Sequence, residues 1–374
     1  MLPEMFSCIF RNSRTVMACC LLSLGPLVAN ATEVEEAASQ ISDRDKFKSA
    51  VRELRTGAGP RYQSLRQELD HYPLAVYLDA LVIEGNLHYG KPEDVIAFLQ
   101  SAGTSPIAMR TLRSFVRHKI EDRRWRAVVE VTEGLGLSTE LSCHRAHALL
   151  MTGETAKATP LLHRVWTVGK SQIKACDPVF KTWYRKSGPS DDVVWERALK
   201  AADARNSTLL RYLKRFASAE LKPSLDDLGE IYGRPDRVTR KTRGSLPRQR
   251  DIAHMGVKRL AKVNPKRALD AMQALSTRFE FDASQQTAMN SLIVRHSLFA
   301  KSAAPLDWVT SRLAELRDDE LTEIYLRSTI AEADWSSFRE GYRWLSAGRQ
   351  TSDEWRYWRV MAAAPGEAER SEAE

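Results

Sequence analysis

Cysteine is scarce in this sequence, and several kinds of functional motif are missing. The 374 residues include five cysteines, of which only Cys143 and Cys176 lie beyond residue 20. There is no glycine-rich phosphate loop and no Gly-x-Ser-x-Gly elbow, so we expect no cofactor. No apolar run reaches the roughly 18 residues that a membrane-spanning helix requires. We therefore expect no stable membrane insertion.

Strand patterns are missing as well, because no segment shows sustained alternation of apolar and polar residues. Apolar residues recur instead at spacings of three and four, as in "LSCHRAHALLMTG" and "DVIAFLQSAG". With the proline and glycine signals between them, these patterns predict close to twenty helices of about 10–16 residues. So many short helices cannot share one central core. The sequence therefore predicts an all-α fold, an α-solenoid of stacked helix pairs.

The first 31 residues have the composition of a secretory signal peptide. Arg11 and Arg14 precede the short apolar run Val16 to Val28, and the small residues of "ANA" follow it. This order of a basic region, an apolar core and a small-x-small cleavage site is typical of exported proteins. An uncleaved membrane anchor is the alternative, and the shortness of the run disfavours it.

Cleavage after Ala31 would leave Cys143 and Cys176 as the two cysteines of the exported chain. An even number in such a protein indicates a disulfide. Asp177 and Pro178 form a helix start, so Cys176 would sit directly before a stiff element. A bond between the two cysteines closes a loop of about 34 residues, for which chain entropy predicts a stabilisation of roughly 3–4 kcal/mol.

The distribution of charge suggests how the helices are divided. The chain carries a formal net charge of +8, which favours polyanionic partners. Residues 234–250, "RPDRVTRKTRGSLPRQR", hold seven basic residues against one Asp, and we call them the basic segment. We expect a signal peptide at 1–31, a first helical block at 32–233, the basic segment as a linker, a second helical block at 251–363 and a polar tail at 364–374.

Four stretches in order carry a resemblance to a known family: "YPLAVYLD" (72–79), "ACDPVFKTW" (175–183), "VVWERALKAADARNSTLLRYL" (193–213), and "ADWSSFREGYRWL" followed by "EWRYWRV" (333–360). The chain from about residue 43 to residue 360 resembles the N-terminal superhelical domain of the soluble lytic murein transglycosylases of Gram-negative bacteria. The resemblance implies a periplasmic horseshoe or ring of short helices. It also implies a disulfide between the cysteine before Asp-Pro, Cys176, and one upstream, matching Cys143.

In the family, a lysozyme-like domain follows the helices and cleaves the MurNAc–GlcNAc bond of peptidoglycan, with one Glu acting as acid and then as base. Its Glu-Ser-x-Phe and Gly-Leu-Met-Gln motifs do not occur in this sequence. No residue can be matched to the catalytic Glu, so whether the chain is an enzyme stays open. We expect either a truncated gene product or a free-standing helical domain.

Candidate catalytic and metal-binding groups in the helices have ordinary structural interpretations. Adjacent carboxylates such as Asp226–Asp227 and Asp318–Asp319 point to different faces of a helix, so we assign no catalytic residue. His144 and His147 follow Cys143, but that cysteine is better used in a disulfide, so we assign no metal.

Two sets of residues are candidates for contact with a glycan or with another domain. Trp residues at helix-pair contacts usually belong to a core. If any are exposed, we expect them to be Trp355 and Trp358, which would face the catalytic domain in a full-length relative. In the basic segment, Arg240, Lys241 and Arg243 form a solvated loop or pair with the carboxylates of anionic wall polymer. Nucleic acid is disfavoured, because no aromatic residues are interleaved and the chain is expected to be exported.

The sequence thus predicts a periplasmic helical domain that takes part in peptidoglycan turnover. It would bind glycan strands, or hold a catalytic transglycosylase domain or another cell-wall enzyme near them, without a catalytic site of its own. The alternatives are a scaffold for periplasmic proteins and the remnant of a split transglycosylase gene.

Overall fold

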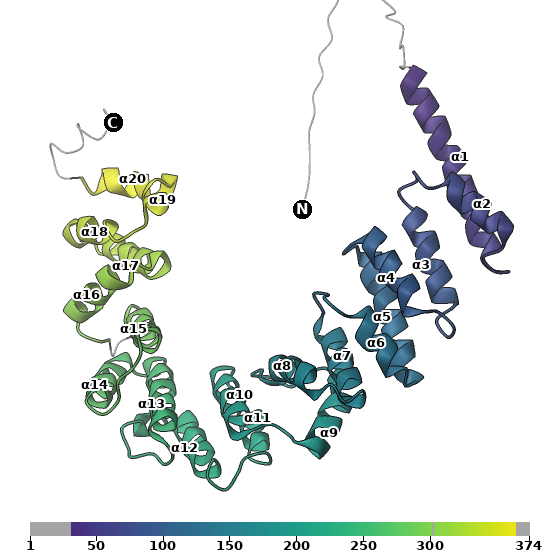
Figure 1. Ribbon diagram of the computed structural model, residues 1–374. Helices are drawn as coiled ribbons and strands as arrows, with labels where there is room; N and C mark the ends of the chain where they lie inside the picture. The colour runs from purple at the N-terminus through teal and green to yellow at the C-terminus, as the bar shows by residue number, and fades with distance from the viewer. Residues whose placement is uncertain (1–30, 301–302, 364–374) are drawn as a thin grey trace, which may run out of the picture. The chain divides into compact units, whose positions relative to one another are not determined.

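The computed structural model describes residues 31–300 and 303–363, and this part of the chain is all α-helical (Figure 1). Twenty α-helices and two short 3-10 helices occur there, and no strand does. The predicted all-α solenoid is confirmed. The predicted signal peptide, except for Ala31, and the predicted polar tail lie outside the described residues.

Contacts between the helices divide the chain into two compact units, with described residues 31–90 and 94–112 in the first and 91–93 and 113–363 (without 301–302) in the second. The first unit holds α1 (Ala31–Glu53), α2 (Pro60–Glu68), α3 (Ala75–Gly85), most of α4 (Pro92–Ala102) and the start of α5 (Pro106–Glu121). Its interior consists of two small apolar clusters, one around Leu69 and Leu78 and one around Phe98 and Ile107.

The second unit contains the remaining helices. In chain order they are α6 (Trp125–Val131), α7 (Thr139–Met151), α8 (Thr155–Trp166), η1 (Lys174–Cys176), α9 (Asp177–Lys186), α10 (Asp191–Asp203), α11 (Ser207–Leu213), α12 (Lys222–Gly233), η2 (Pro235–Arg237), α13 (Leu246–Ala261), α14 (Pro265–Ser276), α15 (Ala283–Ser297), α16 (Leu306–Leu316), α17 (Asp319–Ala331), α18 (Trp335–Tyr342), α19 (Ala347–Gln350) and α20 (Asp353–Met361).

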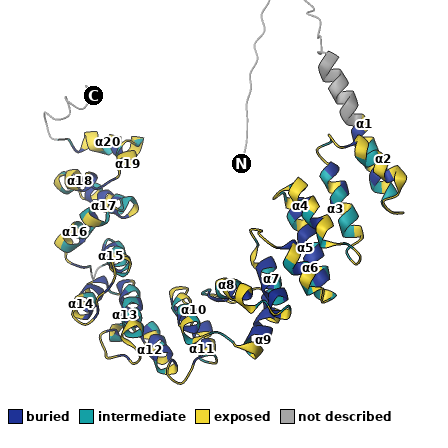
Figure 2. Cartoon of the chain, in the orientation of Figure 1, coloured by how far each residue is buried: buried dark blue, intermediate teal, exposed yellow. Residues whose placement is uncertain are grey.

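Each helix of the second unit packs mainly against its neighbours in the chain, as in the pairs α7–α8, α13–α14 and α17–α18. Buried residues gather where neighbouring helices face each other (Figure 2). They form one continuous apolar cluster that runs from Cys143 in α7 to Ala362 after α20. Since isolated helices of this length are marginal in water, this neighbour packing stabilises them.

The same turn joins helices at four places, although its sequence differs. Two residues after the first helix, the backbone has a positive φ at Arg123 (57°), Gly153 (86°), Arg205 (57°) and Ala333 (55°). At all four turns the N–H of the next residue bonds, at 2.8 Å, to the carbonyl oxygen five residues earlier. This is the hydrogen bond of a Schellman cap, which satisfies the last carbonyls of a helix. The repeat therefore lies in backbone geometry more than in sequence.

Cys143 and Cys176 form a disulfide, with their Cα atoms 5.0 Å apart. The bond ties α7 to the end of η1, directly before α9 starts at Asp177. Both cysteines are 0% exposed and belong to the continuous core of the second unit. The predicted pairing is therefore present, and the bond lies where reductant reaches it poorly.

Replacing both Cys143 and Cys176 with Ala is expected to lower the free energy of unfolding by about 3 kcal/mol, because the unfolded chain regains the freedom of the closed loop. Urea denaturation followed by circular dichroism measures this change. Unfolding the unaltered protein in the presence of reductant should give a similar loss. An unchanged unfolding midpoint in the double variant would contradict the prediction.

Ala333→Gly is expected to raise the free energy of unfolding by about 1 kcal/mol, because glycine adopts a positive φ without the steric cost that alanine has there. Gly153→Ala, at the equivalent turn, is the matched reverse change and should lower it by a similar amount. Thermal and urea unfolding of the two variants measure both effects. Two shifts of the same sign would show that these turns are not equivalent.

Candidate functional site

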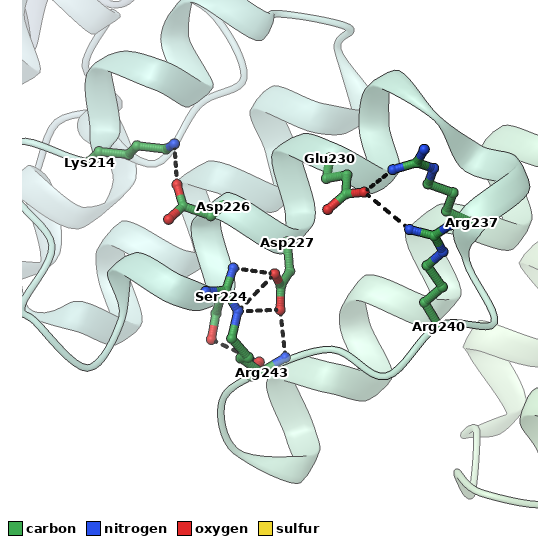
Figure 3. Close-up of polar contacts among 8 residues, drawn as sticks. All are labelled: Lys214, Ser224, Asp226, Asp227, Glu230, Arg237, Arg240 and Arg243. Carbon is green, nitrogen blue, oxygen red and sulfur yellow. Dashed lines mark hydrogen bonds and ion pairs between the residues drawn. The ribbon is translucent and has the colours of Figure 1, made fainter.

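The basic segment is fixed to α12 by Asp227, as Figure 3 shows. This carboxylate is only 8% exposed. It accepts a hydrogen bond from the backbone N–H of Arg243 at 2.5 Å. It also accepts hydrogen bonds from Nη2 and Nε of the Arg243 side chain, at 2.6 and 3.1 Å. Ser224 donates its hydroxyl to the carbonyl oxygen of Arg243 at 3.3 Å. One residue of the segment is thus held by both its main chain and its side chain.

Close backbone approach fixes the rest of the basic segment. Gly244 has φ 101°, and a Cβ atom there would lie 2.1 Å from Ser224 Oγ. Val238 is buried, and a Cβ atom on Gly256 of α13 would lie 2.3 Å from its Cγ2 atom. Two glycines therefore allow the segment to pack against α12 and α13.

These contacts correct the expectation of a linker at 234–250. The basic segment contains η2 and the first turn of α13, and the core of the second unit includes residues on both sides of it. The division that the structure shows falls within residues 91–112 instead. A run of basic residues resembles a solvated linker, but here its main chain is bonded to a buried carboxylate.

The three predicted contact residues of the basic segment have different environments. Arg243 is bound to Asp227 and is a structural anchor. Arg240 is exposed, with its guanidinium 4.0 Å from Glu230, which also binds Arg237 at 2.7 Å (Figure 3). Lys241 is exposed. Contact of these residues with a glycan stays a prediction, and Arg240 and Lys241 are the two whose side chains remain available for it.

A cavity of about 520 Å³ adjoins the basic segment, and we call it the basic cavity. Four cationic side chains line it: Arg205 from the turn after α10, Arg259 from α13, Lys262 from the end of α13, and Arg267 from α14. None of the four forms an ion pair within 4.0 Å with another residue of the described chain. The one carboxylate in its lining is Asp236.

Electrostatics at the basic cavity favour an anion. Burial, followed by the positive charge of Arg205, lowers the pKa of Lys262. Burial, followed by the charge of Lys262, lowers the pKa of His296 nearby. Like charges that destabilise one another would be relieved by a bound anion. Sequence reasoning missed this group, because its members are up to 62 positions apart in the chain, from Arg205 to Arg267.

The expected exposure of Trp355 is wrong. Its side chain is 1% exposed within the core, and its indole Nε1 donates to Glu323 Oε1 at 3.2 Å. Trp358 is half-buried and stacks on Trp335, with ring centroids 6.5 Å apart. The periodicity of a helix explains the difference, since Trp355 faces the preceding helices and the opposite face of α20 is exposed.

That exposed face of α20 consists of Tyr357, Val360 and Met361, which are 57%, 45% and 52% exposed. A spacing of three to four residues puts the three side chains on one side of the helix. This spacing of apolar residues is visible in the sequence, but the prediction was based on the two tryptophans and chose the other face of the helix.

The adjacent carboxylates have structural partners, which agrees with the expectation that neighbours diverge. Asp226 pairs with Lys214 while Asp227 holds Arg243 (Figure 3). Asp318 caps α17 through the N–H of Leu321 at 3.1 Å. On α7, His147 contacts Trp125 and lies 3.2 Å from the hydroxyl of Thr182. These carboxylates and this histidine thus make contacts that stabilise the helices.

No helix in the described ranges is both long enough and apolar enough to cross a membrane.

Comparison with curated proteins finds soluble lytic murein transglycosylases. The protein from Salmonella typhimurium is 27% identical over 298 residues, which are 78% of this chain and 46% of that protein. The protein from Escherichia coli K12 is 25% identical over 352 residues, which are 91% of this chain and 53% of that protein. The chain spans about half the length of the curated relatives it matches.

Solved structures show the same fold. A structure of the lytic transglycosylase Slt of Pseudomonas aeruginosa, an inactive mutant, has a TM-score of 0.58 and 24% identity, covering 85% of this chain and 52% of that one. The 70 kDa soluble lytic transglycosylase in complex with bulgecin A has a TM-score of 0.62 and 20% identity, covering 86% and 52%. At these identities the likeness concerns the helical architecture.

A family model described as Cucumovirus coat protein matches residues 154–242. This range runs from the start of α8 into the basic segment and is less than half of the chain. It does not establish a family.

Asp227→Ala is expected to lower the free energy of unfolding by about 2 kcal/mol, because a buried acceptor of the Arg243 N–H is lost. It should also release the basic segment, whose arginines and lysine are trypsin sites. Urea denaturation and limited trypsin digestion measure the two effects. Asp226→Ala, on the neighbouring residue with an exposed partner, is the control and should change both less. Equal digestion of the two variants would contradict the prediction.

Proposed function

We propose that this chain, which is similar to soluble lytic murein transglycosylases over most of its length, serves as a superhelical domain in peptidoglycan turnover in the periplasm. Its cationic residues bind the anionic groups of glycan strands, or the domain holds a catalytic transglycosylase domain or another cell-wall enzyme close to those strands. The similarity to these relatives and the predicted signal peptide support the proposed periplasmic location.

The observation that carries wall binding is the basic cavity. Arg205, Lys262 and Arg267 reach its lining from three different helical segments and have no ion-pair partner among the described residues. Guanidinium groups bind carboxylates in pairs of parallel hydrogen bonds, and the stem peptides of peptidoglycan carry carboxylates. The exposed Arg240 and Lys241 of the basic segment extend the positive charge.

We further propose that the helical domain cleaves no glycosidic bond by itself. A glycosidase acid requires a raised pKa, which a partly apolar cleft provides. The family's Glu-Ser-x-Phe motif is missing from the sequence.

The alternative function, a scaffold for other periplasmic proteins, is supported by the exposed apolar face of α20. Tyr357, Val360 and Met361 form a contiguous apolar surface of the kind that binds protein partners. The remaining alternative is that the chain is the inactive remnant of a split transglycosylase gene.

Binding of the purified protein to murein sacculi tests the wall-binding proposal. We expect the unaltered protein to be retained. In the double variant Lys262→Glu with Arg267→Glu, the affinity for sacculi should fall about tenfold, which corresponds to a loss of about 1.4 kcal/mol of binding free energy. Lys48→Glu with Arg52→Glu, two exposed cations of α1, changes the net charge equally and is the control. Sacculi are pelleted at a fixed low salt concentration and the bound protein is quantified.

Equal losses in the two double variants would show that retention reflects net charge alone. If sacculi retain the protein only after other periplasmic proteins are added, the scaffold alternative holds. The same incubation shows whether anhydro-muropeptides form, and we expect none. Their appearance would contradict the absence of a catalytic site and leave the wall-binding result intact.

A further inference from the structure

Arg197, in α10, is a buried cation without a carboxylate partner. Only 4% of the surface of Arg197 is exposed. The guanidinium lies over the ring of Trp166, 4.4 Å from the centroid, and Nη2 donates to the carbonyl oxygen of Lys170 at 3.3 Å. Its Nε atom is buried and has no hydrogen-bond partner. Buried arginines are ordinarily paired with an anion, so this one requires an explanation.

The contacts of Arg197 within the chain compensate only part of its burial. Removing a cation from water costs several kcal/mol in a folded protein. The cation–π contact with Trp166 offsets part of that cost, and one long hydrogen bond to Lys170 adds little. Burial accordingly lowers the pKa of Arg197, an effect that the phenol groups of Tyr184 and Tyr212 partly offset. A methionine would fill the same space without this cost.

Arg197 lines a cavity of about 280 Å³, which we call the Arg197 cavity. Tyr184 and Tyr212 also line this cavity, as does Asn206 at the start of α11. The hydroxyl of Tyr184 accepts the indole N–H of Trp166 at 2.7 Å, so the wall is held in place. The exposed carboxylate of Asp177, directly after the disulfide-bonded Cys176, also belongs to the lining.

These features select a particular kind of anion. A single guanidinium matches the two oxygens of one carboxylate. A doubly charged phosphate would bring more negative charge towards Asp177 than a carboxylate does. The cavity is larger than a carboxylate alone, and the ring of Tyr212, which is 38% exposed, offers a face for an apolar or sugar body attached to it.

We propose that the Arg197 cavity binds a small molecule through its carboxylate, with the guanidinium of Arg197 as the anion-binding group and Tyr212 against the body of the ligand. The site uses residues other than the four cations of the basic cavity. The proposal therefore goes beyond wall binding and does not depend on it.

Calorimetric titration of the full chain with three probes tests the chemistry. N-acetylmuramic acid carries a carboxylate, N-acetylglucosamine is the matched sugar without it, and lactate is a carboxylate without the sugar. We expect N-acetylmuramic acid to bind with a Kd of about 1 mM and N-acetylglucosamine at least tenfold more weakly. Lactate binding equally well would identify free small acids as the ligand class, and weaker lactate binding would identify acids carried on a sugar.

Equal binding of both sugars, or no binding of either acid at about 10 mM, would overturn the proposal. Inorganic phosphate competing better than lactate would overturn the choice of a carboxylate.

Variants locate the binding at this cavity. Arg197→Lys keeps the charge but loses the two-pronged geometry, and we expect at least a tenfold loss in affinity. Because a change at this buried position can disturb folding, Asp177→Asn provides a second test at an exposed position. It removes a like charge from the cavity lining, so the acid should bind about threefold more tightly. Asp353→Asn, in the first turn of α20, makes the same change in net charge and should have no effect. Unchanged affinity in Asp177→Asn, or an equal gain in both Asp variants, would place the acid elsewhere.

Discussion

Packing of each short helix against its neighbours in the chain is the constraint on which the rest of this structure depends. Helices of this length are unstable alone, and no central core is available to all of them. In the second unit, the helices share one continuous apolar cluster that runs from Cys143 to Ala362. The equivalent turns at Gly153 and Ala333 show how a repeat can persist in backbone geometry while its sequence varies. The disulfide adds a covalent constraint to the same arrangement.

Because the core forms where each helix packs against the next one in the chain, the buried charged groups lie at the junctions between consecutive helices. Most charged side chains there have partners, as Asp227 and Arg243 do. The basic cavity and Arg197 are exceptions, because their cations meet one another or an aromatic ring instead of a carboxylate. Unsatisfied positive charge beside a cavity is the feature that a structural role does not explain. Both proposals about ligands rest on this contrast between paired and unpaired cations.

The similarity of this chain to soluble lytic murein transglycosylases gives these cations a setting. The relatives it matches are about twice as long as the aligned region, and the shared part is helical. In the proposed role, peptidoglycan would offer carboxylates to the basic cavity, and the exposed face of α20 would offer an apolar surface to a protein. Wall contact and partner contact would then use different parts of the second unit's helix series, α10–α14 in its middle for the first and α20, its last helix, for the second.

The sequence by itself determined the helical class, the solenoid and the pairing of Cys143 with Cys176, because helix periodicity is a local signal and only two of the five cysteines lie beyond residue 20. Only the tertiary structure decided which charges are free. Arg243 is one of seven cations in a basic run, yet it is held by Asp227, while Arg205 and Arg267 meet at a cavity across 62 positions. Likewise Trp355 is buried because of the direction in which α20 packs. Composition gives the number of charges and rings, but contacts between distant residues determine which of them find a partner.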